Sequence, residues 1–293
     1  MKKEEKNVDL ILSANPFNLK YTLECGQCFR WKHLQIDKNN IENSYIGIIN
    51  DRVLKISQDD KNIYVSSNKK ENLENVVKKY FDLNVDYLKI ESEISKIDQN
   101  INKAVKNTSG IRILNQSNFE TLISYIISAN NNIPRISRSI NVISEKYGQK
   151  IDYENNIYYL FPTPEMLKDV TEDDFQNCGV GFRARYLKHT VADILNGKIN
   201  LNSLKNIDTN DAKKGLLSIM GVGPKVADCV LLFSYGRKEI FPIDVWVKRV
   251  MENIYFKKST SLKQIDEYAK NNFGKYAGIV QQHLFYNIRE GFI

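Results

Sequence analysis

The segment 215–229, which reads GLLSIMGVGPKVADC, constrains the fold more than any other part of the chain. Apolar residues at helical spacing lie on both sides of its glycine-rich turn, so the segment predicts two helices joined by a tight hairpin. Gly221 and Gly223 have no Cβ, which allows positive φ and a close approach of a ligand to the backbone. Pro224 suits the first position of the second helix, where no N–H partner is needed.

This hairpin also predicts a binding site for an anion. The first-turn N–H groups of the second helix have no partner within the helix, and they point outward at the positive end of its dipole. A DNA phosphate is an anion of the kind that binds there. The formal net charge of +7 agrees with a polyanionic partner.

The chain of 293 residues is long enough for two domains with a large core. Its first part contains short β-rich runs separated by turn residues, which predict a small twisted antiparallel sheet. The runs are residues 17–23, 45–49, 53–56 and 63–65, with hairpin turns at 50–52 and 59–62. Residues 72–98 follow a helical apolar period, and we expect this helix to cover one face of the sheet.

No strand is expected in the second part, where helical periods dominate. One of its helices should begin at a capping box formed by Ser117 and Glu120. We therefore predict an α+β protein, with an antiparallel-sheet domain and its covering helices at 1–112 and an all-α domain at 113–293. The helix-hairpin-helix is expected at about 209–236. Further helices are expected at 245–255 and 276–290.

The number and spacing of the four cysteines limit which metal sites the chain could form. Cys25 and Cys28 would supply only half of a zinc site, and the chain has only three histidines, so we expect reduced thiols and no metal. The C-terminus carries no cysteine cluster of the iron–sulfur type. The charged N-terminus is unlike a signal peptide, and no stretch is long enough to span a bilayer. We expect a cytoplasmic monomer without membrane contact.

Lys225 stands one residue past the hairpin proline, and Asp244 follows nineteen residues later, directly before another helical run. Hairpin glycines, a lysine just inside the helix and an aspartate at this distance resemble the lysine-bearing, bifunctional helix-hairpin-helix DNA glycosylases. The resemblance implies that Lys225 attacks the sugar C1′ and forms a Schiff base. It implies that Asp244 stabilises positive charge on the sugar and helps to move protons. A simple phosphate contact for Lys225 and a helix N-cap for Asp244 are the alternative roles.

The segment 25–31, CGQCFRW, narrows the resemblance to the 8-oxoguanine DNA glycosylases, and this resemblance covers residues 10–290. In that family the glycine matching Gly26 offers its backbone carbonyl to the damaged base. 8-Oxoguanine carries an N–H at N7 where guanine has a lone pair. One carbonyl therefore distinguishes the two bases by about 1–3 kcal/mol.

The same resemblance assigns further residues to the flipped base. Gln281 matches the residue that recognises the Watson–Crick edge, and Phe285 matches one that stacks on the base. Their i, i+4 spacing places them on one helix face, where both can contact one ligand. Cys229 matches the residue on the opposite face of the base. For Phe285 and Cys229, packing in the core is the alternative role.

Other residues are expected at the DNA itself. Asn130 and Arg135 match positions that fill the hole in the duplex and contact the orphan cytosine, and Arg183 matches a second arginine for that cytosine. Phe182 would be the wedge, while a solvated turn for Asn130 and surface charge for the two arginines are the alternatives. The remaining expected DNA contacts are Gly221, Gly223, Val226 and Trp246.

The chain departs from the family pattern at three positions. Trp246 replaces a histidine that contacts phosphate, and its indole N–H can donate instead. Ile288 replaces an aspartate, and Pro224 replaces a threonine. None of these changes touches Lys225 or Asp244.

The resemblance implies a base-excision-repair enzyme that flips out and excises 8-oxoguanine, with strand cleavage by β-elimination. Its sheet domain would resemble the TATA-binding-protein-like domain of that family, and two helical lobes would enclose the active site. The expected partner is double-stranded DNA containing 8-oxoguanine. No organic cofactor is expected, although the hairpin carbonyls offer a site for a structural cation. Two alternatives are a monofunctional alkylpurine glycosylase of the same fold, which lacks the lysine, and a DNA-binding protein without chemistry.

Overall fold

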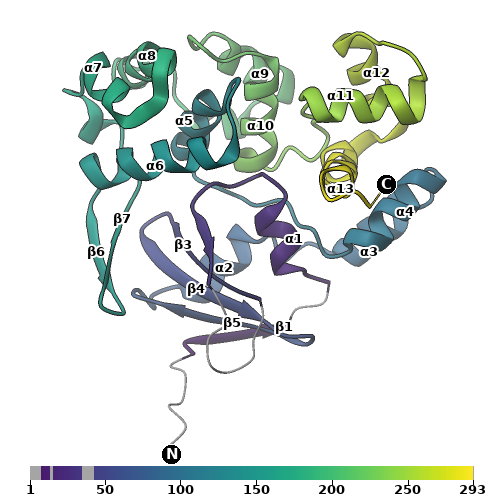
Figure 1. Cartoon of the computed structure of the whole chain (residues 1–293), viewed down its shortest axis with the longest axis horizontal. Helices are drawn as coiled ribbons and strands as arrows, with labels where there is room; N and C mark the ends of the chain where they lie inside the picture. Colours follow the sequence, from purple (N-terminus) through teal and green to yellow (C-terminus); the bar gives the residue numbers. More distant parts are fainter. Residues whose placement is uncertain (1–7, 14–15, 35–42, 293) are drawn as a thin grey trace, which may run out of the picture.

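The computed structural model describes residues 8–13, 16–34 and 43–292. A five-stranded antiparallel sheet lies at one end of the molecule, and most of the helices gather at the other end (Figure 1). The order of the strands in the sheet is β1-β5-β4-β3-β2. The strands are β1 (Leu10–Ser13), β2 (Trp31–His33), β3 (Asn43–Ile49), β4 (Arg52–Gln58) and β5 (Asn62–Ser67).

The turns of this sheet confirm both predicted hairpins. Asn50 adopts the left-handed conformation between β3 and β4, with φ of 48°. The side chain of Asp59 accepts hydrogen bonds from the backbone N–H groups of Lys61 (2.8 Å) and Asn62 (2.7 Å) between β4 and β5. These short connections fix the antiparallel register of the three central strands.

The first predicted strand, at 17–23, is wrong, because this segment contains the helix α1 (Leu19–Glu24). The side chain of Asn18 caps the helix and accepts a backbone N–H hydrogen bond of 2.9 Å. Leu19 and Leu23 are both buried. Their spacing of four residues fits an alternating strand and also one face of a helix. Alternation over so short a segment therefore could not distinguish a strand from a helix.

The predicted helix at 72–98 is two helices, α2 (Leu73–Tyr80) and α3 (Tyr87–Ile94), which belong to different cores. The apolar face of α2 packs beneath the sheet, as expected. In contrast, α3 and α4 (Gln99–Thr108) join the helical core, where α4 contacts the C-terminal helix α13 (Ala277–Arg289) (Figure 1). The helical part of the molecule therefore contains residues from both sides of residue 112.

The remaining helices form two lobes, which confirms the predicted architecture of an antiparallel-sheet domain followed by a helical domain (Figure 1). The first lobe contains α5 (Asn118–Ser128), α6 (Ile133–Tyr147), α7 (Glu172–Phe175), α8 (Ala184–Leu195), α9 (Thr209–Leu217) and α10 (Pro224–Tyr235). The second lobe contains α11 (Val245–Met251), the unpredicted α12 (Leu262–Asn272) and α13, beside α3 and α4. The predicted hairpin is formed by α9 and α10. None of the described helices is long and apolar enough to cross a membrane.

The expectation of no strand after residue 113 is wrong, because β6 (Lys150–Tyr153) and β7 (Asn156–Tyr159) form a hairpin. Glu154 and Asn155 at its turn both adopt positive φ, 47° and 60°, as a tight two-residue hairpin requires. The hairpin extends along the sheet domain (Figure 1). There, Lys55 forms an ion pair of 3.0 Å with Glu154, so these unpredicted strands add a contact between the two domains.

The predicted capping box of α5 does not form. The side chain of Ser117 makes no capping hydrogen bond. Glu120 instead lies 3.8 Å from the guanidinium of Arg30, near the end of the CGQCFRW segment. Because Arg30 is buried, a charge partner for it is worth more than a local cap at the start of the helix.

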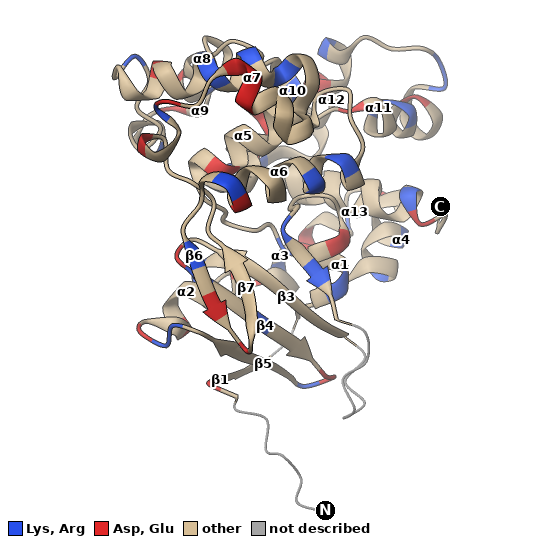
Figure 2. Ribbon diagram, turned by 60° about the vertical axis from the view of Figure 1, so that its left-hand side comes forward, with Lys and Arg blue, Asp and Glu red and all other residues tan. Residues whose placement is uncertain are grey.

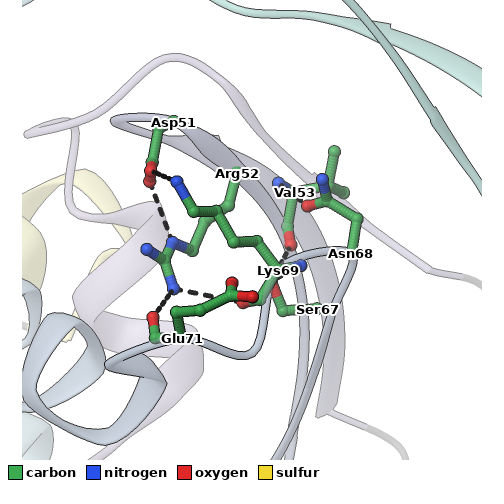
Figure 3. Close-up of polar contacts among 7 residues, drawn as sticks. All are labelled: Asp51, Arg52, Val53, Ser67, Asn68, Lys69 and Glu71. Carbon is green, nitrogen blue, oxygen red and sulfur yellow. Dashed lines mark hydrogen bonds and ion pairs between the residues drawn. The ribbon is translucent and has the colours of Figure 1, made fainter.

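A polar network around Arg52 fastens the β3–β4 turn to the segment that leads into α2 (Figure 3). The buried guanidinium donates from Nη1 to the carbonyl oxygens of Lys69 (3.1 Å) and Glu71 (2.9 Å). Its Nε donates to the carboxylate of Asp51 at 3.0 Å, and Lys69 pairs with the same carboxylate. This network fixes the position from which α2 packs against the sheet.

We expect Arg52→Met to lower the free energy of unfolding by about 1–3 kcal/mol, because two carbonyl oxygens lose their donor. The control is Lys78→Met, which removes an exposed i, i+4 pair with Glu74 and should cost less than about 0.5 kcal/mol. Urea denaturation followed by circular dichroism measures both. Equal losses in the two variants would contradict the role given to Arg52.

Candidate active site

Lys225 lies in the first turn of α10, and its half-buried side chain contacts α5. Its Nζ is 3.3 Å from Oγ of Ser128 and 4.9 Å from the centre of the Tyr125 ring. Ser128 uses its hydroxyl proton to donate to the backbone carbonyl of Tyr125 at 2.7 Å. Its oxygen is therefore left to accept from the lysine amine, and α5 determines where that amine lies.

Asp244 begins the neighbouring helix, so the lysine and the aspartate come from different lobes. Its Oδ1 accepts the backbone N–H of Val247 at 2.8 Å, which makes Asp244 the N-cap of α11. In the part of the chain that the structure describes, Oδ2 accepts no hydrogen bond and no ion pair joins Asp244 to Lys225 within 4.0 Å. Among the described residues, the amine thus has polar neighbours but no carboxylate partner, and one carboxylate oxygen of Asp244 accepts no hydrogen bond.

The thiol of Cys229 is influenced by both of these charges. Burial raises the pKa of Cys229 to about 12, the ammonium of Lys225 opposes this rise, and the carboxylates of Asp228 and, less strongly, Asp244 add to it. Both charged groups are therefore close to one buried thiol, one helical turn beyond the lysine. At neutral pH this thiol is protonated and offers a neutral, polarisable surface rather than a nucleophile.

Gly26 and Phe285, predicted to bind the base, lie together although 259 positions separate them in the chain. A Cβ on Gly26 would be 3.4 Å from Cε1 of Phe285 and 4.0 Å from Cδ1 of Ile133. The φ of Gly26 is +82°, so both its backbone and its surroundings favour glycine. Gln281 lies one turn before Phe285 on the same face of α13, and its Oε1 accepts from Nε2 of Gln282 at 2.7 Å.

The loop that carries Gly26 is held by its neighbour Gln27, whose side chain is fully buried. Nε2 of Gln27 donates to the carbonyl oxygens of Thr22 (2.9 Å) and Arg112 (2.7 Å), and Oε1 accepts the N–H of Leu114 at 2.9 Å. The loop is therefore hydrogen-bonded to residues 112–114, the segment that connects the two domains. The position of the Gly26 carbonyl depends on these hydrogen bonds.

The residues predicted to contact the opposite strand form one cluster beside α5. Asn130 is exposed in a left-handed turn with φ of 51°. The guanidinium of Arg183 donates to the carbonyl oxygens of Asn130 (2.9 Å) and Val180 (3.0 Å) and also pairs with that of Ala129. It lies 4.3 Å over the ring of Phe182, which is 58% exposed.

The surface-charge alternative for Arg183 is wrong, since the residue is only 5% exposed. Burial lowers the pKa of Arg183, and the like charge of nearby Arg135 adds to this effect. Arg135 itself is exposed, as that alternative assumed. Arg183 therefore holds the Asn130 turn by hydrogen bonds to its carbonyl oxygens, while the side chains of Asn130, Arg135 and Phe182 are accessible to a ligand.

The two hairpin glycines have different reasons to be glycine. Gly221 has φ of +84°, and a Cβ there would be 2.5 Å from Cγ of Tyr186, so the fold itself requires glycine. Gly223 has φ of −92° and would direct a Cβ into open space. Nothing in the described protein excludes a side chain at Gly223, and the open space in front of it leaves room for an external group such as the predicted phosphate.

Two other predicted DNA contacts differ in what they can offer. The side chain of Val226 is buried, so this residue presents only its backbone N–H to a phosphate. Trp246 is 54% exposed at the start of α11, and the guanidinium of Arg249 lies 5.3 Å from its ring. Among the described residues, no group of three or more His, Cys, Asp or Glu side chains could hold a metal ion, and the four cysteines are free thiols.

Comparison with known proteins identifies the family. Residues 9–122 match the family model of the 8-oxoguanine DNA glycosylase N-terminal domain. Residues 123–275, more than half of the chain, match that of the HhH-GPD superfamily base excision DNA repair proteins. The chain belongs to the 8-oxoguanine DNA glycosylase family.

Relatives within this family agree along nearly the whole chain. A crystal structure of the Clostridium acetobutylicum 8-oxoguanine glycosylase/lyase, in complex with double-stranded DNA containing cytosine opposite 8-oxoguanine, is 42% identical. Its TM-score is 0.90, with 98% of this chain and 99% of that chain covered. The N-glycosylase/DNA lyase of Saccharomyces cerevisiae is 32% identical over 84% of this chain and 70% of its own length.

The sequence analysis assigned no role to three residues that contact the site. Ser128 and Tyr125 lie in α5, and its apolar period gives no signal for a role beyond packing in the core. Gln27 is part of the CGQCFRW segment, and its place in that motif was the only signal. The roles predicted for the residues of the site itself stay predictions.

We expect Gly223→Ala to change the stability of this glycosylase by less than about 1 kcal/mol, because a poorer N-cap is offset by a less flexible unfolded chain. Its affinity for undamaged duplex should fall about fivefold, equivalent to one backbone hydrogen bond of about 1 kcal/mol. Gly221→Ala should instead cost about 1–3 kcal/mol of stability. Thermal melts and fluorescence anisotropy at fixed salt measure the two quantities. An unchanged duplex affinity in Gly223→Ala would show that no phosphate approaches this residue.

Proposed function

We propose that the protein excises 8-oxoguanine from duplex DNA through a Schiff base at Lys225 and then cleaves the strand by β-elimination. Membership in the family makes the chain a bifunctional DNA glycosylase and lyase. The observation that carries the Schiff-base step is the half-buried amine of Lys225, which lies against Ser128 and Tyr125 on α5 and has no ion pair with a carboxylate among the described residues. A monofunctional enzyme, which activates water, has no need of such an amine.

The base would be recognised before it is removed. The flipped 8-oxoguanine would donate its N7–H to the carbonyl of Gly26 and stack on Phe285, with Gln281 at its Watson–Crick edge. Guanine would bring a lone pair to the same carbonyl and leave it without a donor, which costs about 1–3 kcal/mol. Asn130, Arg135 and Phe182 would occupy the gap that the flipped nucleotide leaves in the duplex.

The chemical steps then follow from the Lys225 amine and the Asp244 carboxylate. As the bond between C1′ and the base breaks, Asp244 stabilises the positive charge on the sugar, and the Lys225 nitrogen forms its bond to C1′. The departing base takes up the proton that the Lys225 nitrogen loses after it bonds to C1′. The C1′–O4′ bond then breaks as O4′ takes up a proton from solvent, and the nitrogen lone pair forms the C1′=N bond of the protonated Schiff base. Loss of a C2′ proton then breaks the bond between C3′ and its phosphate oxygen, which cleaves the strand. A monomeric state and a cytoplasmic location stay predictions.

We expect borohydride to trap the protein covalently on a duplex with one 8-oxoguanine opposite cytosine, and we expect Lys225→Gln to abolish the adduct, because the amide cannot form a Schiff base. Gel electrophoresis under denaturing conditions detects the adduct. Duplex affinity of the same variant, measured by anisotropy, serves as the control for folding and binding. A variant that binds DNA and still forms the adduct would contradict the proposal.

We expect Asp244→Asn to slow base excision by about 10²–10⁴-fold, because it removes the charge while an amide oxygen can still cap α11. The comparison variant Asp244→Ala loses both charge and cap, and should also lose about 1 kcal/mol of stability. Single-turnover excision and urea denaturation separate the two effects. If Asp244→Asn kept the full excision rate, the aspartate would be only a helix cap.

A further inference from the structure

Tyr125 joins the two halves of the site. It is 3% exposed on α5. Its ring stacks on Phe233, with centroids 5.7 Å apart and planes at 19°, and meets the ring of Phe29 edge-on at 5.5 Å. A ring packed on two sides by other rings has little freedom to rotate, so its two ends lie at fixed positions.

One end of Tyr125 lies at the carbonyl that would recognise the base. Its hydroxyl is 3.3 Å from the carbonyl oxygen of Gly26 and 3.3 Å from that of Gln27, so it donates between the two. Burial raises the pKa of Tyr125 well above its ordinary value, and the phenol therefore remains a donor at neutral pH. A carbonyl oxygen has two lone pairs, so the Gly26 carbonyl can accept from Tyr125 and still accept an N–H from a ligand.

The rest of Tyr125 contacts the nucleophile. The amine of Lys225 lies 4.9 Å from the ring centre, within the range of a cation–π interaction. The backbone carbonyl of Tyr125 accepts from Ser128, whose oxygen lies 3.3 Å from the same amine. One residue thus contacts the Gly26 carbonyl through its hydroxyl and the Lys225 amine through its ring, and its backbone carbonyl holds the serine that accepts from that amine.

We infer that Tyr125 is a positioning residue that determines specificity for the oxidised base. Its hydroxyl holds the Gly26 carbonyl in the orientation that accepts N7–H of 8-oxoguanine, and its ring holds the Lys225 amine at the depth of the sugar. This inference rests on the proposed function, because it uses Gly26 as the acceptor and Lys225 as the nucleophile. The hydroxyl matters only while a base is bound, whereas the ring matters in every step that uses the lysine.

The test is Tyr125→Phe, which removes the hydroxyl and keeps the ring. Two rates are measured under single-turnover conditions: excision from a duplex with 8-oxoguanine opposite cytosine, and cleavage of the same duplex with a preformed abasic site. The second reaction needs Lys225 but has no base to recognise. We expect excision to fall about five- to tenfold, the effect of one hydrogen bond in a buried site, while abasic-site cleavage stays within about twofold of the unchanged protein.

Two further variants separate this role from a structural one. Tyr235→Phe also removes a hydroxyl that donates to a backbone carbonyl, that of Leu201 at 2.7 Å. Because Tyr235 ends α10 about 15 Å from Lys225 along the helix, we expect both rates to be unchanged. Ser128→Ala removes the acceptor of the lysine amine, and we expect both rates to fall together.

Three results would overturn the inference, or the function on which it rests. Equal losses of excision and abasic-site cleavage in Tyr125→Phe would mean that the hydroxyl only supports the fold. An unchanged excision rate in that variant would mean that the Gly26 carbonyl is oriented without it. The absence of both reactions in the unchanged protein would instead contradict the proposed function.

Discussion

The packing of α10 against α5 determines what the Lys225 amine can do. A lysine in the first turn of an exposed helix would extend into water, where its ammonium is solvated and unreactive. Here the side chain crosses to α5 and lies over Tyr125 beside Ser128. The two helices belong to the same lobe, but the other predicted groups of the site come from elsewhere: Asp244 begins α11 in the second lobe, and Gly26 lies in the loop after α1. The site therefore exists only when both lobes and the sheet domain are assembled.

The joint between the domains is the second requirement. Gln27 is fully buried, and its hydrogen bonds connect the Gly26 loop to residues 112–114. A buried amide that loses one of these partners would leave a polar group unsatisfied, so the loop has a strong preference for one position. The β6–β7 hairpin adds a second connection through Glu154 and Lys55.

The charged residues are not concentrated in one place: Lys and Arg are spread over both lobes and mixed with Asp and Glu (Figure 2). The net charge thus favours binding to DNA of any sequence, and the position of the protein along the DNA must be determined by local contacts.

The features that could be predicted from sequence are those whose cause is local. The hairpin glycines, the proline of α10 and the N-cap at Asp244 each follow from the preferences of a few adjacent residues. The contacts that were missed are long-range: Tyr125 meets Gly26 across 99 residues, and Lys225 meets Ser128 across 97. The two wrong strand predictions have a related cause. Leu19 and Leu23 fit either structure, and β6–β7 depends on a turn formed by Glu154 and Asn155, which have no strong turn signal together.

The central claim is that one amine, that of Lys225, bonds to the sugar. Its most direct test is a peptide map of the borohydride-reduced protein–DNA adduct by tandem mass spectrometry, after digestion of both the protein and the DNA. The account predicts a sugar remnant on Lys225 and on no other amine of the chain. A remnant on another lysine or on the N-terminal amine, with Lys225 unmodified, would contradict it.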